Sequence, residues 1–382
     1  MKNLYLTITA CLLLTLLSAN CSTEDDNLPA YTREIMFEEE TDTANEIAFL
    51  HLSDIHASTA SLAPAVYYLT GSDSNFALLT GDIMIADNVI NTLKSSPKPC
   101  LLIPGNHDIY RVYARSVGQW AFRKTILNAI GQESYAHFAD EAHNYWYSDF
   151  TQGGHTLRVI GIDQYEAQSV AHPIDSWDHI QNLYSQGQVN WFIDLLEHSA
   201  DADGIIIAIH NGFGNDKVGV RDTTRTGPFT SILASTTTEG YGYYGTGNTL
   251  MIPDIVEAYI TGNNLTERKY PNSTVACDTL TVTTHFTRPA NNFIAYFGGH
   301  LHYDIAEPLP GYPRQLQILI TECGKTGLTQ GLDDAPKGKF GNPSYCFNLN
   351  TVNFIRRQLC IKRIGACHKI DGTLRDSIIF NF

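Results

Sequence analysis

Five short apolar runs in this sequence each end in a polar break that carries aspartate, asparagine or histidine. The most compact example is residues 100–110, CLLIPGNHDIY, in which an apolar run stops at Pro104-Gly105 and three polar side chains follow. Across the five breaks, the side chains able to bind a metal are Asp54, His56, Asp82, Asn106, His210, His300 and His302. All are oxygen or imidazole donors, which suit manganese, iron or zinc. The pattern therefore predicts a metal site.

The number and spacing of these donors indicate two ions rather than one. Residues two apart in an extended segment face the same way, so Asp54 and His56 can point into one cavity. The same holds for His300 and His302. Seven ligands exceed what one ion accepts and suit two ions that share a bridging carboxylate. Asp82 is the natural bridge, because it is the aspartate without a histidine two residues away.

Two ions at such a site suit phosphoryl transfer. They lower the pKa of a bound water to make hydroxide, and they hold the attacking and departing oxygens of an in-line displacement. His107 can stabilise the phosphoryl oxygens or protonate the leaving group. Asp108 can fix the tautomer of His107, or it can be only a turn or cap residue. The candidate catalytic residues are therefore His107 and Asp108.

The elements that must position these groups are strands of an α/β sheet. Apolar runs predict buried strands over residues 47–52, 76–79, 101–103, 205–209 and 293–297, each directly before one of the polar breaks. In an open α/β sheet, sites form in the crevice outside the carboxyl ends of the strands. Helical spacing predicts helices over 60–69, 87–93, 115–130 and 186–198, and alternation predicts strands of a second sheet over 144–150 and 157–162. The five strands should therefore share one site.

The length of 382 residues predicts one catalytic domain with additions rather than a simple core. We place this domain at residues 47–382. Residues 211–291 form an irregular insertion, whose tyrosines and glycines at 239–249 suit a substrate rim or, equally, a surface loop packed on itself. Residues 345–382 are rich in strand-like runs and are expected to complete a sheet.

Residues 1–21 resemble an export signal rather than part of the fold. Lys2 precedes an apolar stretch over 4–17, and small residues lead to Cys21. A cysteine at this place resembles a bacterial lipoprotein signal. We therefore expect an exported chain with its only membrane anchor at Cys21, at the outer membrane, facing the periplasm or the cell surface. The alternative is an ordinary secretory leader whose cleavage removes Cys21. Residues 22–46 are polar and acidic and are expected to form a flexible tether.

Composition limits the partners and the covalent cross-links. The formal net charge is −15, whereas nucleic-acid binders usually carry basic patches, so no nucleic-acid binding is expected. Four cysteines lie close together near the end of the chain, namely Cys323, Cys346, Cys360 and Cys367. In an oxidising compartment they can form one or two disulfides, whose connectivity cannot be read from the sequence.

Five of these motifs together resemble a known family. Taken in order, Asp54-x-His56, Gly81-Asp82, Gly105-Asn106-His107-Asp108, His210 and Gly299-His300-x-His302 resemble the motif set of the calcineurin-like metallophosphoesterases, over residues 47–304. The resemblance implies a four-layer α/β/β/α sandwich around a dinuclear metal centre. It implies that one ion is held by Asp54, His56, Asp82 and His302. It assigns the second ion to Asp82, Asn106, His210 and His300, and catalysis to His107 paired with Asp108.

One position bears on the branch of the family. Purple acid phosphatases have a tyrosine ligand three residues after the bridging aspartate, where this sequence has Ile85. A tyrosinate-bound ferric ion is therefore not expected. The motif set looks nearer to phosphodiesterases and exported phosphatases.

Two functions of different classes follow from the sequence. The favoured one is an exported, metal-dependent hydrolase of phosphoric monoesters or diesters. Its substrate would be a phosphate-ester small molecule, a phospholipid head group or a phosphorylated glycan. The alternative is a non-catalytic cell-surface binding protein on the same fold, with residues 211–291 as its contact face. A scaffold that had lost turnover should lack ligands or the catalytic histidine, and in this sequence none is missing.

Overall fold

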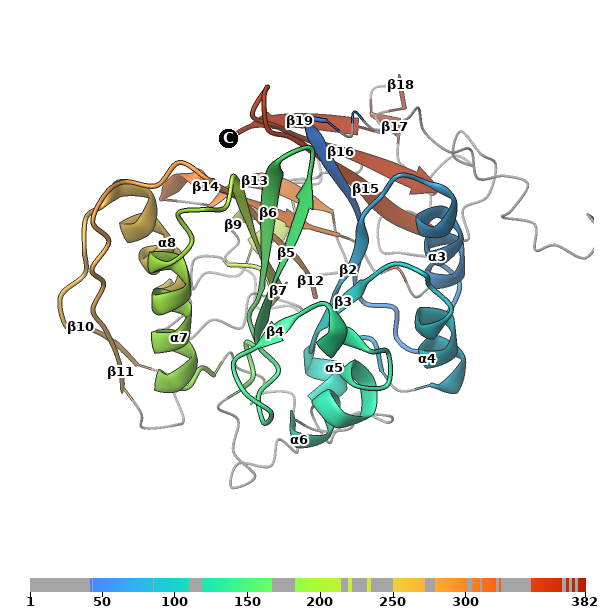
Figure 1. Ribbon diagram of the computed structural model, residues 1–382, viewed down its shortest axis with the longest axis horizontal. Helices are drawn as coiled ribbons and strands as arrows, with labels where there is room; N and C mark the ends of the chain where they lie inside the picture. The colour runs from blue at the N-terminus through green and yellow to red at the C-terminus, as the bar shows by residue number, and fades with distance from the viewer. Residues whose placement is uncertain are drawn as a thin grey trace, which may run out of the picture. The chain divides into compact units, whose positions relative to one another are not determined.

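Two β-sheets, of six and seven strands, form the framework of the computed structural model (Figure 1). The structure describes residues 42, 44–84, 86–109, 119–166, 183–213, 219–221, 232–234, 250–271, 279–300, 304–309, 311–320, 323, 345–365, 369–370, 373–374 and 377–382. The predicted leader with Cys21 lies outside these residues, as does nearly all of the predicted tether.

The six-stranded sheet has the order β19-β16-β15-β1-β2-β3. Its parallel half consists of β1 (Glu46–Leu52), β2 (Phe76–Thr80) and β3 (Cys100–Ile103). Its antiparallel half consists of β15 (Cys346–Asn353), β16 (Gln358–Gly365) and β19 (Ser377–Asn381). The strands near the end of the chain therefore extend the sheet that β1 to β3 begin.

The seven-stranded sheet has the order β13-β14-β12-β7-β6-β5-β4. Its parallel strands are β14 (Tyr312–Leu319), β12 (Phe293–Gly299), β7 (Gly204–Asn211) and β6 (His155–Gly161). Antiparallel strands flank them, namely β13 (Ile305–Leu309), β5 (Trp146–Gln152) and β4 (His137–Phe138). Each sheet thus carries parallel strands whose carboxyl ends lie at one edge.

The two sheets pack against each other through a shared apolar cluster. Phe49 of β1 stacks on Phe76 of β2 at 4.9 Å between ring centroids and meets the ring edge of Phe297 of β12 at 5.2 Å. The same cluster includes residues from both sheets, among them Leu78, Leu101, Ile206 and Ile318, all fully buried. Strands buried on both faces are apolar throughout, which explains the short continuous apolar runs in the sequence.

Helices lie on the outer sides of the two sheets (Figure 1). On one side are α3 (Leu62–Gly71), which contacts β1 and β2, and α4 (Asp87–Lys94). On the other side, α7 (Gln186–Glu197) and α8 (Met251–Thr261) share an apolar cluster with β6, β7 and β12. The predicted α/β class is therefore confirmed, whereas the exact four-layer sandwich stays a prediction.

Helices in two parts of the chain bear on the sequence-based expectation. The helix predicted over 115–130 is helical over the described residues 119–127, where α6 (Gln119–Phe122) continues directly into a π-helical segment at Arg123–Leu127, and a 3₁₀ turn follows at Gln132–Ser134. Residues 115–118 lie outside the described residues. The segment 211–291, expected to be irregular, contains the eleven-residue α8. Its apolar side chains Ile252, Ile255, Val256 and Tyr259 recur at helical spacing and are buried.

The remaining strands form small hairpins. These are β8 (Gly219–Arg221) with β9 (Ile232–Ala234), β10 (Arg268–Pro271) with β11 (Thr279–Val282), and β17 (Lys369–Ile370) with β18 (Thr373–Leu374). A helix α5 of four residues, Asn106–Ile109, follows β3. It carries the central motif of the sequence.

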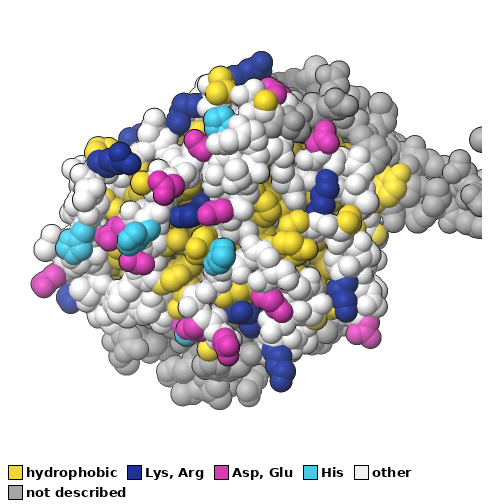
Figure 2. All heavy atoms as spheres, in the orientation of Figure 1, with side chains coloured by type: hydrophobic (Ala, Val, Ile, Leu, Met, Phe, Trp, Pro, Cys, Tyr) yellow, Lys and Arg dark blue, Asp and Glu magenta, His cyan; other side chains and the backbone are white. Residues whose placement is uncertain are grey.

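The surface carries charges of both signs. On the face drawn in Figure 2, basic and acidic side chains are interspersed, and apolar side chains gather near its middle. Among the described helices, none is both long enough and apolar enough to cross a lipid bilayer.

Candidate metal centre

Backbone hydrogen bonds draw the loops at the ends of β1, β2 and β12 together. The N–H of Asp54 donates to the carbonyl of Gly81 at 3.0 Å, and the N–H of His56 donates to the carbonyl of Asp82 at 2.9 Å. From the other sheet, the N–H of His300 donates to Oδ2 of Asp54 at 2.9 Å. Groups from both sheets are therefore brought together at the strand ends.

The backbone at these strand ends is held in an uncommon conformation. Asp54, His56, Asp82 and His300 have φ angles of 53°, 44°, 55° and 69°, in the left-handed region that side chains other than glycine rarely adopt. Such conformations persist where the surrounding structure enforces them, and they concentrate at functional sites. Four of the seven predicted ligands thus have a strained backbone conformation, and the surrounding hydrogen bonds offset the energetic cost of this strain.

Glycines allow the loops to approach this closely. A Cβ on Gly299 would overlap Ser53 and the carboxylate of Asp54, and a Cβ on Gly105 would overlap Asp82. Gly81 has a φ of +95°, and a Cβ there would overlap His210. The glycines in the Gly-Asp, Gly-Asn-His-Asp and Gly-His motifs are therefore required by packing at the site.

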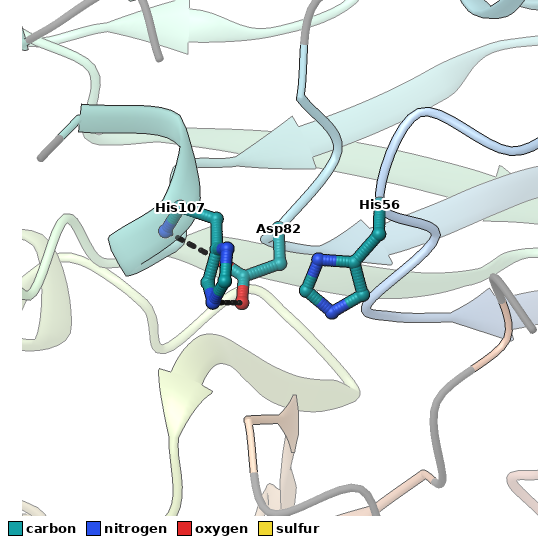
Figure 3. Close-up of side chains that lie close together, drawn as sticks. All are labelled: His56, Asp82 and His107. Carbon is teal, nitrogen blue, oxygen red and sulfur yellow. Dashed lines mark hydrogen bonds and ion pairs between the residues drawn. The ribbon is translucent and has the colours of Figure 1, made fainter. Parts of the chain in front are cut away.

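The carboxylate of Asp82 lies at the centre of the constellation. Its Oδ1 accepts the backbone N–H of His107 at 2.8 Å. Its Oδ2 lies 3.3 Å from Nε2 of His210 and 3.8 Å from Nε2 of His107. Figure 3 shows the rings of His107 and His56 on either side of this carboxylate. Because Asp82 is only 1% exposed, water screens its charge little and the carboxylate interacts strongly with these neighbours.

The side-chain oxygen of Asn106 joins the two histidines of the second sheet. Its Oδ1 lies 3.0 Å from Nε2 of His210 and 3.0 Å from Nδ1 of His300. Nδ1 of His210 lies 2.7 Å from the carbonyl oxygen of Thr80. Since a carbonyl only accepts, this contact places the hydrogen on Nδ1 and turns Nε2 toward Asp82 and Asn106. A backbone carbonyl that orients an imidazole in this way is typical of metal-binding histidines.

Two groups of donor atoms meet the geometric requirement for a metal ion. One consists of His56, Asp82 and His107, the other of Asp82, His210 and His300, and within each group the donor atoms lie within 4.8 Å of one another. Asp82 belongs to both. The donors are carboxylate and imidazole, which fit manganese, iron or zinc, and two groups that share one carboxylate fit a pair of ions.

The electrostatics of the site favour a cation beside Asp82. Burial opposes ionisation of this carboxyl, yet the imidazoles of His210 and His107 hold the pKa of Asp82 well below its usual range. Burial likewise opposes a charge on His210, but the Asp82 carboxylate raises the pKa of His210 to about 9. On the side of His210, the Asp82 carboxylate therefore stabilises a neighbouring positive charge, as a metal site requires.

The structure brings together six of the seven predicted ligands, namely Asp54, His56, Asp82, Asn106, His210 and His300. His302 lies outside the described residues. His107 lies close to the ligands: its ring centroid lies 4.6 Å from that of His56, and it shares a donor group with His56 and Asp82.

Asp108 makes the local backbone contact expected of a turn residue and also bonds to a second loop. Its carboxylate accepts backbone N–H groups from Gly105 at 2.8 Å, Met84 at 2.7 Å and Ile83 at 3.3 Å. These bonds tie the loop after β2 to the loop after β3. Asp108 therefore positions the loop that carries Asp82, and its predicted pairing with His107 stays a prediction.

Gln164 is a positioning residue that sequence reasoning missed. Its Oε1 accepts the backbone N–H groups of His210 at 2.8 Å and Asn211 at 2.6 Å, and it is fully buried. Tyr165 adds a bond from its hydroxyl to Oδ1 of Asn211 at 2.7 Å. A signal was present, because the apolar run 157–162 ends in the polar break Asp163-Gln164 in the same way as the five ligand-bearing runs.

Comparison with known proteins gives a family and a set of structural neighbours. The model of the calcineurin-like phosphoesterase family matches residues 47–304, about two thirds of the chain. A dimetal phosphatase from Danio rerio (LOC 393393) is similar at 12% identity with a TM-score of 0.49, covering 88% of this chain and 98% of its own. Vps29 from Chaetomium thermophilum is similar at 9% identity with a TM-score of 0.32, covering 89% and 99%. No curated protein sequence matches the chain.

Proposed function

The chain belongs to the calcineurin-like phosphoesterase family, and we propose that it hydrolyses phosphoric esters at a two-metal centre bridged by Asp82. One observation carries this proposal. A single buried carboxylate is shared by two donor groups, one reached from β1 and β3 and the other from β7 and β12. When bound, a pair of metal ions makes water a stronger nucleophile and neutralises the charge of a phosphoryl group.

The ligand sets follow the family pattern. Asp54, His56 and Asp82, together with His302, would hold one ion, and Asp82, Asn106, His210 and His300 would hold the other. The short distances from Asp82 and Asn106 to His210 support the second set directly. The position of Asp54 is supported by its bond to the backbone of His300.

The direction of substrate approach follows from exposure. The side chains of His107 and His56 are 23% and 18% exposed, whereas those of Asp54, Asp82 and His210 are at most 1% exposed. A phosphoric ester would therefore reach the site from the side of the two exposed imidazoles. On this view His56 and His107 stand at the mouth of the site and the carboxylates form its floor.

His107 is suited to contact the phosphoryl group. Burial lowers the pKa of His107 to about 4, although the charge of Asp82 acts in the opposite direction. A neutral imidazole carries one N–H, which can donate to a phosphoryl oxygen or to the departing ester oxygen. Its backbone N–H is already bonded to Asp82, so the ring is held next to the bridging carboxylate.

The finer features of the proposal rest on the sequence. The leader with Cys21 and the acidic segment 22–46 support an exported, lipid-anchored chain whose domain starts near residue 47. The substrate class is a phosphate-ester small molecule, a phospholipid head group or a phosphorylated glycan. Whether monoesters or diesters are preferred is a question for assay.

The test is metal-dependent turnover. The chain is stripped with chelator, supplied with Mn²⁺, and assayed with bis-p-nitrophenyl phosphate and p-nitrophenyl phosphate. Turnover that disappears with chelator and returns with metal supports the hydrolase, and the ratio of the two rates gives the ester preference. If both ions bind and neither substrate is hydrolysed, the non-catalytic binding protein becomes the better account.

A further inference from the structure

Cys323 and Cys346 lie next to each other in the fold. Their sulfur atoms lie 3.9 Å apart, and both side chains are buried. Cys346 begins β15 of the six-stranded sheet, and Cys323 lies four residues beyond β14 of the seven-stranded sheet. A bond between these sulfurs would connect the two sheets covalently.

The strand register excludes the other described cysteines as partners of Cys346. Thr351 of β15 is the residue opposite Cys360, so Cys346 lies five residues further along the strand, about 17 Å away. Cys100 lies on β3, and two strands, β1 and β2, separate β3 from β15, which corresponds to about 14 Å. A disulfide needs Cα atoms within about 7 Å. Among the described cysteines this leaves Cys323, whose sulfur lies 3.9 Å from that of Cys346.

The backbones of both cysteines are anchored next to the proposed metal centre. The N–H of Cys323 donates to the carbonyl of Ser53 at 3.1 Å, and Ser53 directly precedes Asp54. The N–H of Cys346 donates to the hydroxyl of Ser61 at 3.0 Å. Both anchors flank the loop that carries Asp54 and His56. The backbones of the two cysteines are thus both held beside this loop, with their sulfurs 3.9 Å apart.

The surroundings in the folded chain act differently on the two thiols. The hydrogen bond with Cys323 lowers the pKa of Cys346 against the effect of burial, and the charge of Arg363 acts in the same direction. Arg363 is itself buried and forms an ion pair with Asp304 and a hydrogen bond to Asn348. In the folded chain Arg363 acts on both thiols, but burial still raises the pKa of Cys323 well above its usual range.

We propose that Cys323 and Cys346 form a disulfide when the chain folds under oxidising conditions, and that this bond ties the two sheets together behind the loop of Asp54 and His56. The oxidant is a disulfide. The Cys346 thiolate attacks one of its sulfurs and releases a thiol, and the Cys323 thiolate then attacks the mixed disulfide and releases the second thiol. The cysteines lose two protons and two electrons, and the oxidant becomes two thiols. Since both side chains are buried in the folded chain, the exchange occurs before folding is complete.

The test maps the bond directly and does not depend on hydrolase activity. The full chain is refolded with oxidised glutathione, unreacted thiols are blocked with N-ethylmaleimide, and the digested protein is analysed by mass spectrometry before and after reduction. The expected result is one cross-linked pair of peptides that contains Cys323 and Cys346, while Cys100 and Cys360 are blocked as thiols. Blocked thiols at Cys323 and Cys346, or a bond from either one to Cys277 or Cys367, would overturn the proposal.

A second measurement uses thermal unfolding. Reduction should lower the midpoint of the wild-type chain by about 5 °C, since the bond closes the loop between the two cysteines. Cys360→Ser, a control on a partly exposed cysteine, should show the same sensitivity to reductant. Cys346→Ser should show none. A Cys346→Ser variant that keeps the sensitivity would place the cross-link elsewhere.

Discussion

The backbone N–H of His300 donates to the carboxylate of Asp54 at 2.9 Å, although 246 residues separate the two. The bond joins the end of β12 to the end of β1, which belong to different sheets. Both residues have a positive φ, so each helps to hold the other's loop in its uncommon conformation. A proposed ligand of one ion is therefore directly hydrogen-bonded to a proposed ligand of the other.

This link separates two substitutions of Asp54. Asp54→Asn keeps an oxygen that can accept the N–H of His300 but removes the charge, so it should weaken mainly the first ion. Asp54→Ala also removes the acceptor and should reduce the occupancy of both ions. Metal content after dialysis against a limiting Mn²⁺ buffer distinguishes them. Equal retention of the second ion in both variants would argue against the link.

His107→Ala tests whether this imidazole acts on substrate or holds metal. We expect both ions to remain and kcat to fall by about 10²- to 10⁴-fold, since a positioned donor contributes a factor of this size. His56→Ala is the matched comparison, because its ring lies 4.6 Å from that of His107, and it should lose metal. Loss of an ion in His107→Ala would make His107 a ligand instead.

Gln164→Ala should destabilise the chain without touching a proposed ligand side chain. It leaves the buried N–H groups of His210 and Asn211 without their acceptor, which costs about 2–4 kcal/mol. Gln358→Ala, at a partly exposed position on β16, serves as control and should change little. The free energy of urea unfolding measures both. If Gln164→Ala lowers the free energy of unfolding by less than Gln358→Ala does, the backbone of β7 does not depend on the side-chain oxygen of Gln164.

His51 should make the chain sensitive to mild acid. Burial and the charge of Arg363 lower the pKa of His51 from 6.5 to about 3, so below pH 6.5 the unfolded chain binds a proton that the folded chain does not. The contribution of His51 to the free energy of unfolding is therefore fully present above pH 6.5. It decreases as the pH falls toward 3, by at most about 1.4 kcal/mol per pH unit.

The measurement for His51 is urea unfolding between pH 7 and pH 4.5, with chelator present. His51→Gln can still bond to Thr80, the partner of His51 at 3.0 Å, but it does not ionise. Its stability should therefore fall less steeply with acid than that of the wild type. His198→Gln, at a position 73% exposed, should follow the wild type. Parallel slopes for all three chains would refute the assignment.

Much of the site could be predicted from the sequence because each ligand follows its own strand directly. A buried strand reads as a short apolar run, and the polar break after it marks the carboxyl end where α/β sites form. This local pattern predicted the loops of Asp54, Asp82 and His210, which the structure brings together. The α/β class follows from the same alternation of strands and helices.

The parts that could not be predicted depend on packing between distant segments. The closeness of His56 and His107, and the bonds of Asp108 to the loop after β2, exist only once the loops after β1, β2 and β3 lie side by side. The Cys323–Cys346 contact likewise needs both sheets in place. The helix α8 could be predicted locally, since Ile252, Ile255 and Val256 have helical spacing, although the segment 211–291 around it is irregular in sequence.

The central claim is that one carboxylate bridges two metal ions, and metal stoichiometry tests it most directly. Elemental analysis of the Mn²⁺-loaded wild type should give two ions per chain, and Asp82→Ala should bind neither. Asp194→Ala, whose side chain is 74% exposed on α7, should keep both, and circular dichroism should show all three chains folded. A folded Asp82→Ala variant that still binds two ions would contradict the account.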